Sequence, residues 1–138
     1  MTTSSSAFFK SFVTAFILFV LGDMLWHVWL LGDFYNGRIA LLNGGTMPPE
    51  SFPGFVFAFE LIAAAGTTYF VLPSRSVQEG AWKGAVLGLM MISAINFVCH
   101  TLLVNWDLTL VVVDTAWGIV IGAITGAAIM MVSGKKLR

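Results

Sequence analysis

Residues 108–132 read LTLVVVDTAWGIVIGAITGAAIMMV, a long apolar run in which Asp114 is the one charged side chain. Crossing about 30 Å of lipid hydrocarbon at about 1.5 Å per residue takes about 20 such residues, so this run predicts a transmembrane helix. Three more apolar runs cover about residues 8–31, 53–72 and 81–104. Because backbone groups cannot stay unpaired in lipid, runs of this length predict helices. The predicted fold is therefore all-α: a single membrane domain over residues 1–138, built as a four-transmembrane-helix bundle.

The composition also places the chain in lipid. Hydrophobic residues make up 58% of the 138 residues and charged residues 10%, whereas soluble domains carry about 25% charged residues. A soluble protein with so few charges would aggregate, so we expect the lipid bilayer to surround it. The net charge is zero and the predicted helices contain no basic run, which argues against a nucleic-acid partner. All four prolines fall between the predicted helices or at their ends: Pro48, Pro49, Pro53 and Pro73.

The basic residues predict the direction of the helices. Six of them flank helix ends that share one side of the membrane: Lys10, Arg75, Lys83, Lys135, Lys136 and Arg138. Only Arg38 lies on the other side. By the positive-inside rule, the N- and C-termini are cytoplasmic. Tryptophans at the predicted interfaces suit this arrangement, with Trp82 at the inner interface and Trp29 and Trp106 at the outer one.

Glycines repeat every four residues along the last predicted helix, as Gly118, Gly122 and Gly126, and Gly84 and Gly88 repeat this spacing in the third. Such spacing lets two helix backbones approach closely. The pattern predicts either packing between helices of one chain or a homodimer through the face of the last helix.

Strongly polar side chains form a layer within the predicted helices. They are Asp23 and His27 in the first helix, Glu60 in the second, Asn96 and His100 in the third, and Asp114 in the fourth. Counted from the outer ends of the helices, all lie roughly 6 to 13 Å deep. Because a charged side chain at the bilayer centre costs about 2.5–3.5 kcal/mol on insertion scales, we expect this layer to face the bundle interior. The layer predicts an outward-facing site for a small ion or polar ligand.

Two other interpretations of these residues stay open. The acids could be neutral, hydrogen-bonded residues that hold helices together, since burial favours the uncharged form of a carboxyl group. His27 and His100, the two histidines of the chain, could instead bind a metal ion or haem. The pattern Asp-x-x-Trp also occurs twice and puts an aromatic ring one turn from an acid, Trp26 after Asp23 and Trp117 after Asp114.

Several short motifs resemble a family of small bacterial membrane proteins known as domain of unknown function 2177. They are Asp23–Met24–Leu25–Trp26 with Phe34–Tyr35, Gly84-x3-Gly88, Trp106–Asp107–Leu108–Thr109–Leu110, and Asp114–Thr115–Ala116–Trp117–Gly118. The resemblance covers about residues 16–128. It implies a four-helix, multi-pass protein of the bacterial inner membrane, with Asp23, Trp26, Asp114 and Trp117 as shared residues, and it implies no activity.

The chain departs from the family in the polar layer. Where the family has a Tyr-Asp-x-Thr-Asn run in the third helix, this chain reads Asn96–Phe97–Val98–Cys99–His100. His27 and Glu60 are not family features either. These departures predict that the layer has been rebuilt for a different ligand.

Three functions are consistent with the sequence. The first is a protein that binds or moves a small ion or polar ligand, with ligand-binding residues Asp23, Trp26, Glu60, Asn96, Asp114 and Trp117. The second is an accessory or structural subunit of a larger membrane complex. The third is a metal- or haem-binding membrane enzyme using His27 and His100. An enzyme is less favoured, because no motif such as His-Glu-x-x-His and no nucleophile–base pair is present.

The loop over residues 32–52 bears on each of these functions. Ile39, Leu41 and Leu42, followed by Asn43–Gly44–Gly45, predict a short interfacial helix that ends in a turn. Such a helix either covers the polar layer from outside or simply connects two spans along the membrane surface.

Overall fold

The computed structural model describes residues 5–42 and 52–134, with the side chains of residues 52–55 left out. The described residues form helices and contain no strand, which confirms the all-α class. The elements are α1 (Ser5–Asp23), the π-helical segment η1 (Met24–Leu30), α2 (Gly32–Leu42), α3 (Phe52–Val71), α4 (Val77–Leu102) and α5 (Leu108–Val132). Pro48, Pro49, residues 43–45 and the basic residues Lys135, Lys136 and Arg138 lie outside the described residues.

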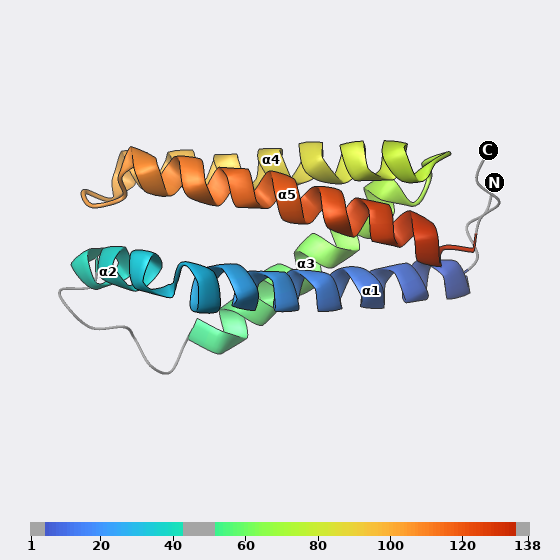
Figure 1. Cartoon of the computed structure of the whole chain (residues 1–138), viewed down its shortest axis with the longest axis horizontal. Helices are drawn as coiled ribbons and strands as arrows, with labels where there is room; N and C mark the ends of the chain where they lie inside the picture. The colour runs from blue at the N-terminus through green and yellow to red at the C-terminus, as the bar shows by residue number, and fades with distance from the viewer. Residues whose placement is uncertain (1–4, 43–51, 135–138) are drawn as a thin grey trace.

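The helices form an elongated bundle (Figure 1). α4 and α5 run antiparallel, α1 packs against α5, and α3 crosses the bundle obliquely while packing against α1, α4 and α5. The start of α1 and the end of α5 lie at the same end of the bundle (Figure 1). At the opposite end, α2 continues beyond η1 and lies beside the turn that joins α4 to α5. Asn105 of that turn donates a hydrogen bond to the carbonyl of Leu41, 3.2 Å away.

Glycines hold α4 and α5 in direct backbone contact. Gly84 of α4 faces Gly122 of α5, and a Cβ added to Gly84 would overlap the carbonyl of Gly122. Gly88 faces Gly118 and Gly80 faces Gly126 in the same way. The glycine spacing seen in the sequence is therefore used within one chain, as small residues allow between helices in lipid. A homodimer through Gly118, Gly122 and Gly126 would need another arrangement of these two helices.

Caps fix where two helices begin. The hydroxyl of Ser76 accepts a hydrogen bond from the backbone N–H of Glu79, 3.0 Å away, so α4 begins at Val77, ahead of the predicted residue 81. The carboxylate of Asp107 accepts from the N–H of Leu110 at 2.8 Å and caps α5. Arg38 of α2 donates to the same carboxylate at 3.0 Å, which ties α2 to the start of α5.

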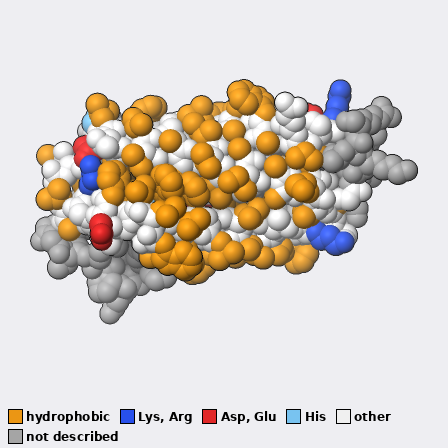
Figure 2. All heavy atoms as spheres, viewed as in Figure 1, with side chains coloured by type: hydrophobic (Ala, Val, Ile, Leu, Met, Phe, Trp, Pro, Cys, Tyr) orange, Lys and Arg blue, Asp and Glu red, His pale blue; other side chains and the backbone are white. Residues whose placement is uncertain are grey.

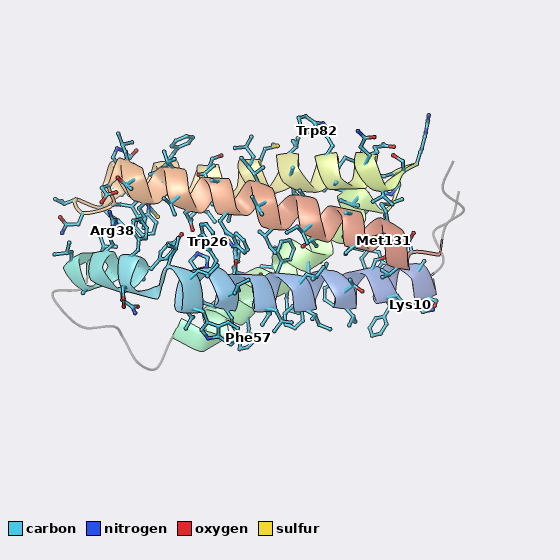
Figure 3. All side chains as sticks on the ribbon, viewed as in Figure 1. Lys10, Trp26, Arg38, Phe57, Trp82 and Met131 are labelled. Atoms are coloured by element: carbon cyan, nitrogen blue, oxygen red, sulfur yellow. The ribbon has the colours of Figure 1, made fainter. Side chains whose placement is uncertain are left out.

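The face of the bundle seen in Figure 2 is apolar along its length, and its charged side chains lie near the two ends. Large side chains point outward from the helices, among them Phe57, Trp82 and Met131 (Figure 3), which are 51%, 69% and 71% exposed. Within residues 5–42 and 52–134, three stretches are long and apolar enough to cross a membrane: Ser5–Leu30, Val77–Leu102 and Leu108–Val132. The apolar part of α3, Val56–Val71, is shorter. The described helices are thus compatible with a helical membrane bundle.

Candidate functional site

The site begins where α1 changes into the π-helical segment η1. Asp23 is the last residue of α1, and η1 carries Trp26 and His27 before the chain bends at Leu31. Short π-helical segments inside α-helices are frequent at functional sites, because the wider turn redirects side chains. Here it brings the imidazole of His27 back to the backbone carbonyl of Asp23, 3.2 Å from Nδ1.

His27 joins α1 to α5. Its Nε2 lies 3.1 Å from Oδ1 of Asp114, while its Nδ1 lies 3.8 Å from the carboxylate of Asp23. A backbone carbonyl and an ionised carboxylate are both acceptors, so a histidine that bonds to both carries a proton on each nitrogen. The geometry is therefore that of a charged His27–Asp114 pair, and hydrogen bonds between charged groups are the stronger ones.

Asp114 is held by three donors from three elements. His27 and the hydroxyl of Tyr35 both reach Oδ1 at 3.1 Å, and Asn96 Nδ2 donates to Oδ2 at 2.7 Å. Asn96 is fully buried, and its orientation is fixed because Trp106 donates its indole N–H to Asn96 Oδ1 at 2.9 Å. The amide nitrogen must then face Asp114. Trp106 was expected in the outer aromatic belt, and in the structure its indole N–H also orients Asn96.

Tyr35 is a member of the site that the polar pattern of the sequence did not predict. It lies on α2, is 7% exposed, and contacts Asp114 across the turn at Leu31. Its burial, with the nearby Asp114 carboxylate adding to the effect, raises the pKa of the phenol, so Tyr35 acts as a donor at neutral pH. The only signal was the pair Phe34–Tyr35 in the family resemblance. The expected short helix in this loop is α2, and through Tyr35 it covers one side of the polar layer.

The two Asp-x-x-Trp patterns interlock. Trp117 of α5 donates its indole N–H to Asp23 Oδ1 at 2.6 Å, and Trp26 donates to Tyr35, which bonds to Asp114. The two indole rings stack with centroids 4.7 Å apart and planes 6° apart (Trp26 is labelled in Figure 3). Each tryptophan is therefore connected to the acid of the other pattern: Trp117 bonds directly to Asp23, and Trp26 reaches Asp114 through Tyr35.

Glu60 of α3 lies beside these acids. It is 1% exposed and lies within hydrogen-bonding reach of the side chain of Asp23. No protein N–H or O–H among the described residues donates to its Oε2. A cavity of about 40 Å³ lies beside it, also lined by Asp23, His27 and Asp114. We refer to Asp23, His27, Glu60, Asn96 and Asp114 as the polar cluster.

A family model described as "predicted membrane protein (DUF2177)" matches residues 8–131. The chain belongs to the DUF2177 family. The comparisons with curated proteins and with solved structures gave no significant match. As a DUF2177 member the protein is a predicted membrane protein, and the family description assigns no activity. The expected resemblance is thereby confirmed.

His100 stands apart from the polar cluster in this DUF2177 protein. It lies near the end of α4, is exposed, and its Nδ1 contacts the carbonyl of Trp106. The four-residue spacing from Asn96 predicted a shared face, and both side chains contact Trp106: Asn96 accepts from its indole N–H, whereas the imidazole of His100 contacts its backbone carbonyl. In the described part of the chain, no group of three or more His, Cys, Asp or Glu side chains is arranged to hold a metal ion.

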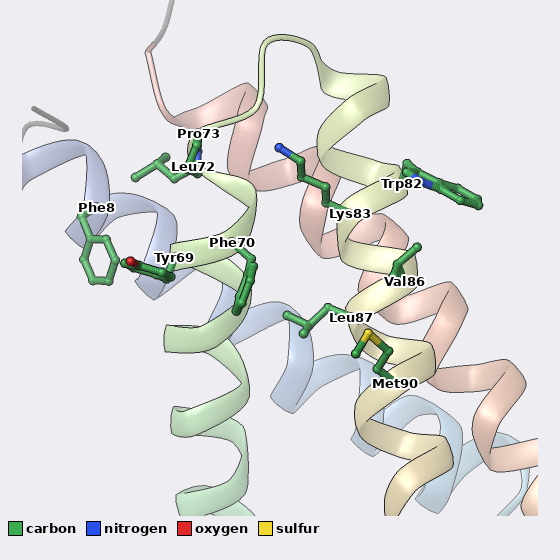
Figure 4. Close-up of a pocket in the computed structure, with 10 residues that line it drawn as sticks. All are labelled: Phe8, Tyr69, Phe70, Leu72, Pro73, Trp82, Lys83, Val86, Leu87 and Met90. Carbon is green, nitrogen blue, oxygen red and sulfur yellow. The ribbon is translucent and has the colours of Figure 1, made fainter. Parts of the chain in front are cut away.

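The DUF2177 chain also carries a larger hollow far from the polar cluster. It measures about 620 Å³ and lies between the end of α3 and the start of α4 (Figure 4). Its walls are mainly apolar, with Phe70 and Leu87 facing each other and Lys83 at the rim (Figure 4). Lys83 is paired with Glu79 at 2.7 Å. Among the described residues, no acid or histidine lines this groove, whereas three acids and a histidine line the small cavity beside Glu60. The small cavity is therefore the better candidate for a site.

Proposed function

We propose that this protein binds a small ion at the polar cluster, taken up from the outer side of the membrane. The observation that carries the proposal is Glu60, a fully buried carboxyl group whose Oε2 receives no protein donor among the described residues and which lines a cavity with Asp23 and Asp114. A buried polar atom without a partner is costly, so a bound ion, proton or water offsets that cost. Ionisable residues inside membrane helices commonly mark ion or proton paths.

In this proposal the remaining predicted site residues hold the acids in place. Trp117 fixes Asp23, Asn96 fixes Asp114, and Trp26 stacks on Trp117 while bonding to Tyr35. Their polar atoms are already used, so the ligand contacts the carboxyl groups that face the cavity. His27 supplies the positive charge that balances Asp114.

The proposed topology has four spans in a bacterial inner membrane, with both ends cytoplasmic. α3 has 20 residues, which at about 1.5 Å each reach about 30 Å. Lys10, Arg75 and Lys83 flank the predicted cytoplasmic ends of their helices and Arg38 the outer side, a charge bias that supports this orientation. In a Cys99→Ala background, Gln78→Cys and Asn36→Cys should react with a membrane-impermeant thiol reagent from opposite sides of intact vesicles. Labelling of both from one side would reject the topology.

Ion binding can be followed through the stacked tryptophans. Because Trp117 bonds directly to Asp23, an ion entering the cluster should change the intrinsic fluorescence of protein reconstituted in nanodiscs. The probes are sodium, potassium and magnesium chloride and a step in pH. We expect a saturable response to at least one of them in wild type and its loss in Glu60→Gln.

The matched control is Asp33→Asn, which removes an exposed acid of α2 at the same end of the bundle. It should respond as wild type does. If wild type responds to none of the salts and to no pH step, or if Glu60→Gln and Asp33→Asn respond alike, the protein does not bind ions at this cluster.

A second candidate function is an accessory subunit of a larger membrane complex. The apolar groove of about 620 Å³ between α3 and α4 favours it, since such a groove at membrane depth could receive a helix of a partner (Figure 4). Leu87→Trp would fill the groove. Co-purification of the same partner with wild type and with Leu87→Trp would argue against docking at this groove.

The metal- or haem-binding alternative has less support. The ring nitrogens of His27 contact Asp114 and the carbonyl of Asp23, and His100 contacts the carbonyl of Trp106. Elemental analysis of wild type beside the His27→Ala/His100→Ala double variant tests it. Stoichiometric iron, copper, zinc or manganese that disappears in the variant would restore this alternative.

A further inference from the structure

We infer that the ion bound at this site is a proton, shared between the carboxyl groups of Asp23 and Glu60. The inference rests on the proposed function and names its ligand. It depends on three features of the described residues: the contact between the two acids, the donors that each oxygen receives, and the size of the cavity beside them.

The contact between the acids requires a proton. Asp23 and Glu60 come from α1 and α3, line the same small cavity, and lie close enough for their side chains to share a hydrogen bond. An ionised carboxylate only accepts hydrogen bonds, so two carboxyl groups can bond to each other only when one of them carries a proton. Trp117 donates to Asp23 Oδ1 at 2.6 Å, so that oxygen already has a donor. Glu60 is 1% exposed and receives no protein donor at Oε2, so it is the acid that holds the proton.

The remaining oxygen atoms suit a proton better than a metal ion. Both oxygens of Asp114 are bonded by His27, Tyr35 and Asn96, and Asp23 Oδ1 is bonded by Trp117. Calcium takes about six or more oxygen ligands and magnesium keeps several of its waters, whereas this cluster has few oxygens left and little space for hydration. The cavity of about 40 Å³ has room for a small number of water molecules, because one water needs roughly 10–15 Å³.

The charged surroundings favour one proton and allow it to leave. Facing Glu60 are Asp23 and His27 from α1 and η1, and Asp114 from α5, whereas α4 contributes only the uncharged Gly88, Met91 and Ile92 to the cavity wall. With the proton in place the acid pair carries one negative charge, and without it two like charges face each other. On release, the proton passes from the Glu60 oxygen to a cavity water and leaves as hydronium. His27 already holds two protons in its pair with Asp114, so it is not the acceptor.

Infrared spectroscopy of the protein in nanodiscs tests the inference directly. A protonated carboxyl group gives a C=O stretch that an ionised one lacks and that shifts in heavy water. We expect this band in wild type at neutral pH and its loss in Glu60→Gln, because the introduced amide can donate to an ionised Asp23. Asp23→Asn should also lose the band, since its amide can donate to an ionised Glu60, and this second variant serves if the first does not fold.

The control is Glu79→Gln, which changes a glutamate of the first turn of α4 that is paired with Lys83 at 2.7 Å. It should keep the band at wild-type intensity. A wild-type spectrum without the band, or a band that stays at full intensity in both Glu60→Gln and Asp23→Asn, would overturn the shared proton.

The outcomes separate the inference from the proposed function. A band that is lost on raising the pH and exchanges in heavy water supports both. A band that neither exchanges nor responds to pH overturns the proton as a ligand and leaves it a structural hydrogen bond. If the band is absent but sodium or potassium changes the tryptophan fluorescence, the inference fails and the proposed function stands. If the band is absent and no ion has an effect, both fail.

Discussion

The indole N–H of Trp117 on α5 donates to the carboxylate of Asp23 on α1, 94 positions away in the sequence, across 2.6 Å. This bond joins the two helices at the polar cluster, and the ring of Trp26 stacks on that of Trp117. Separating the two helices would break this bond. The packing of α1 on α5 therefore depends in part on this one hydrogen bond.

Trp117→Phe should weaken this junction. The change removes a hydrogen bond to a charged group, worth about 1.5–3 kcal/mol, together with part of the ring stack. Unfolding in mild detergent, followed by circular dichroism, should show a loss of this size and the disappearance of the exciton signal of the Trp26–Trp117 pair. Trp29→Phe, at a position 71% exposed, should keep both the stability and the signal. Equal effects of the two changes would contradict the role given to Trp117.

Asp114→Asn should destabilise the protein by about 2–3 kcal/mol, because it leaves His27 without its charged partner and turns a bond from Asn96 into a contact between two amides. The free energy of unfolding in detergent measures this. Asn96 cannot rotate to adapt without giving up its bond from Trp106. Asp33→Asn at the exposed start of α2 is the control and should change the stability by less than about 0.5 kcal/mol.

Gly84→Ala should separate α4 from α5. A methyl group at this position overlaps the carbonyl of Gly122, so the helices must move apart at a cost of about 1–3 kcal/mol. Gly66→Ala on α3 is a matched control, since its added methyl group meets nothing within 4 Å. Thermal unfolding should place Gly84→Ala below wild type and Gly66→Ala at or above it. The reverse order would show that the glycine face does not set the spacing of these helices.

The capping of α5 by Asp107 should weaken at low pH. The backbone N–H of Leu110 and then Arg38 hold the pKa of Asp107 below its usual value of 3.8. A lowered folded-state pKa adds stability above the unfolded value, and this stability is lost as the pH falls through the folded pKa. Hydrogen exchange at the start of α5, measured from about pH 6 to about pH 3, should therefore accelerate relative to the helix interior. Asp107→Asn keeps a capping side chain and should show no such step.

Brominated lipids should distinguish the exposed tryptophans from the buried one. Trp82 is 69% exposed on α4, whereas Trp117 is 9% exposed inside the bundle. In single-tryptophan variants reconstituted in bilayers, bromine on the acyl chains should quench Trp82 strongly and Trp117 weakly. Equal quenching of both would contradict the proposed packing of α5 in the membrane.

The all-helical class follows from the sequence because lipid leaves the backbone few options. Long apolar runs and the positions of the prolines predicted helices at each of the stretches now described as α1, α3, α4 and α5. The start of α4 was placed too late, since the polar turn at residues 77–80 does not look like a span. Its helical state depends on the hydroxyl of Ser76 and on Glu79, which a count of apolar residues does not weigh.

The site was harder to predict than the helices. Depth alone grouped Asp23, His27, Asn96 and Asp114, and the structure joins these four by direct contacts. Their roles as ligands for an ion stay a prediction. Depth also placed His100 in the layer, but its imidazole contacts the backbone carbonyl of Trp106 in the turn after α4 instead.

Tyr35 could not be assigned to the site from periodicity, because it reaches Asp114 only through the bend at Leu31. The π-helical segment η1 has the same effect on His27, whose direction departs from that of an ordinary α-helix. Both residues owe their positions to an irregular backbone, for which the sequence carries no simple repeat.

The glycine contacts between α4 and α5 have a mechanical consequence. Two helices whose backbones touch cannot slide or tilt against each other without steric overlap, so the hairpin moves as one rigid body. That hairpin carries Asn96 and Asp114, while Asp23, His27 and Glu60 belong to the helices packed beside it. A shift of α1 and η1 relative to the hairpin therefore stretches the bonds from His27 to Asp114 and from Trp117 to Asp23 together. Whether the two acids keep their hydrogen-bond donors then depends on the angle between α1 and the α4–α5 hairpin.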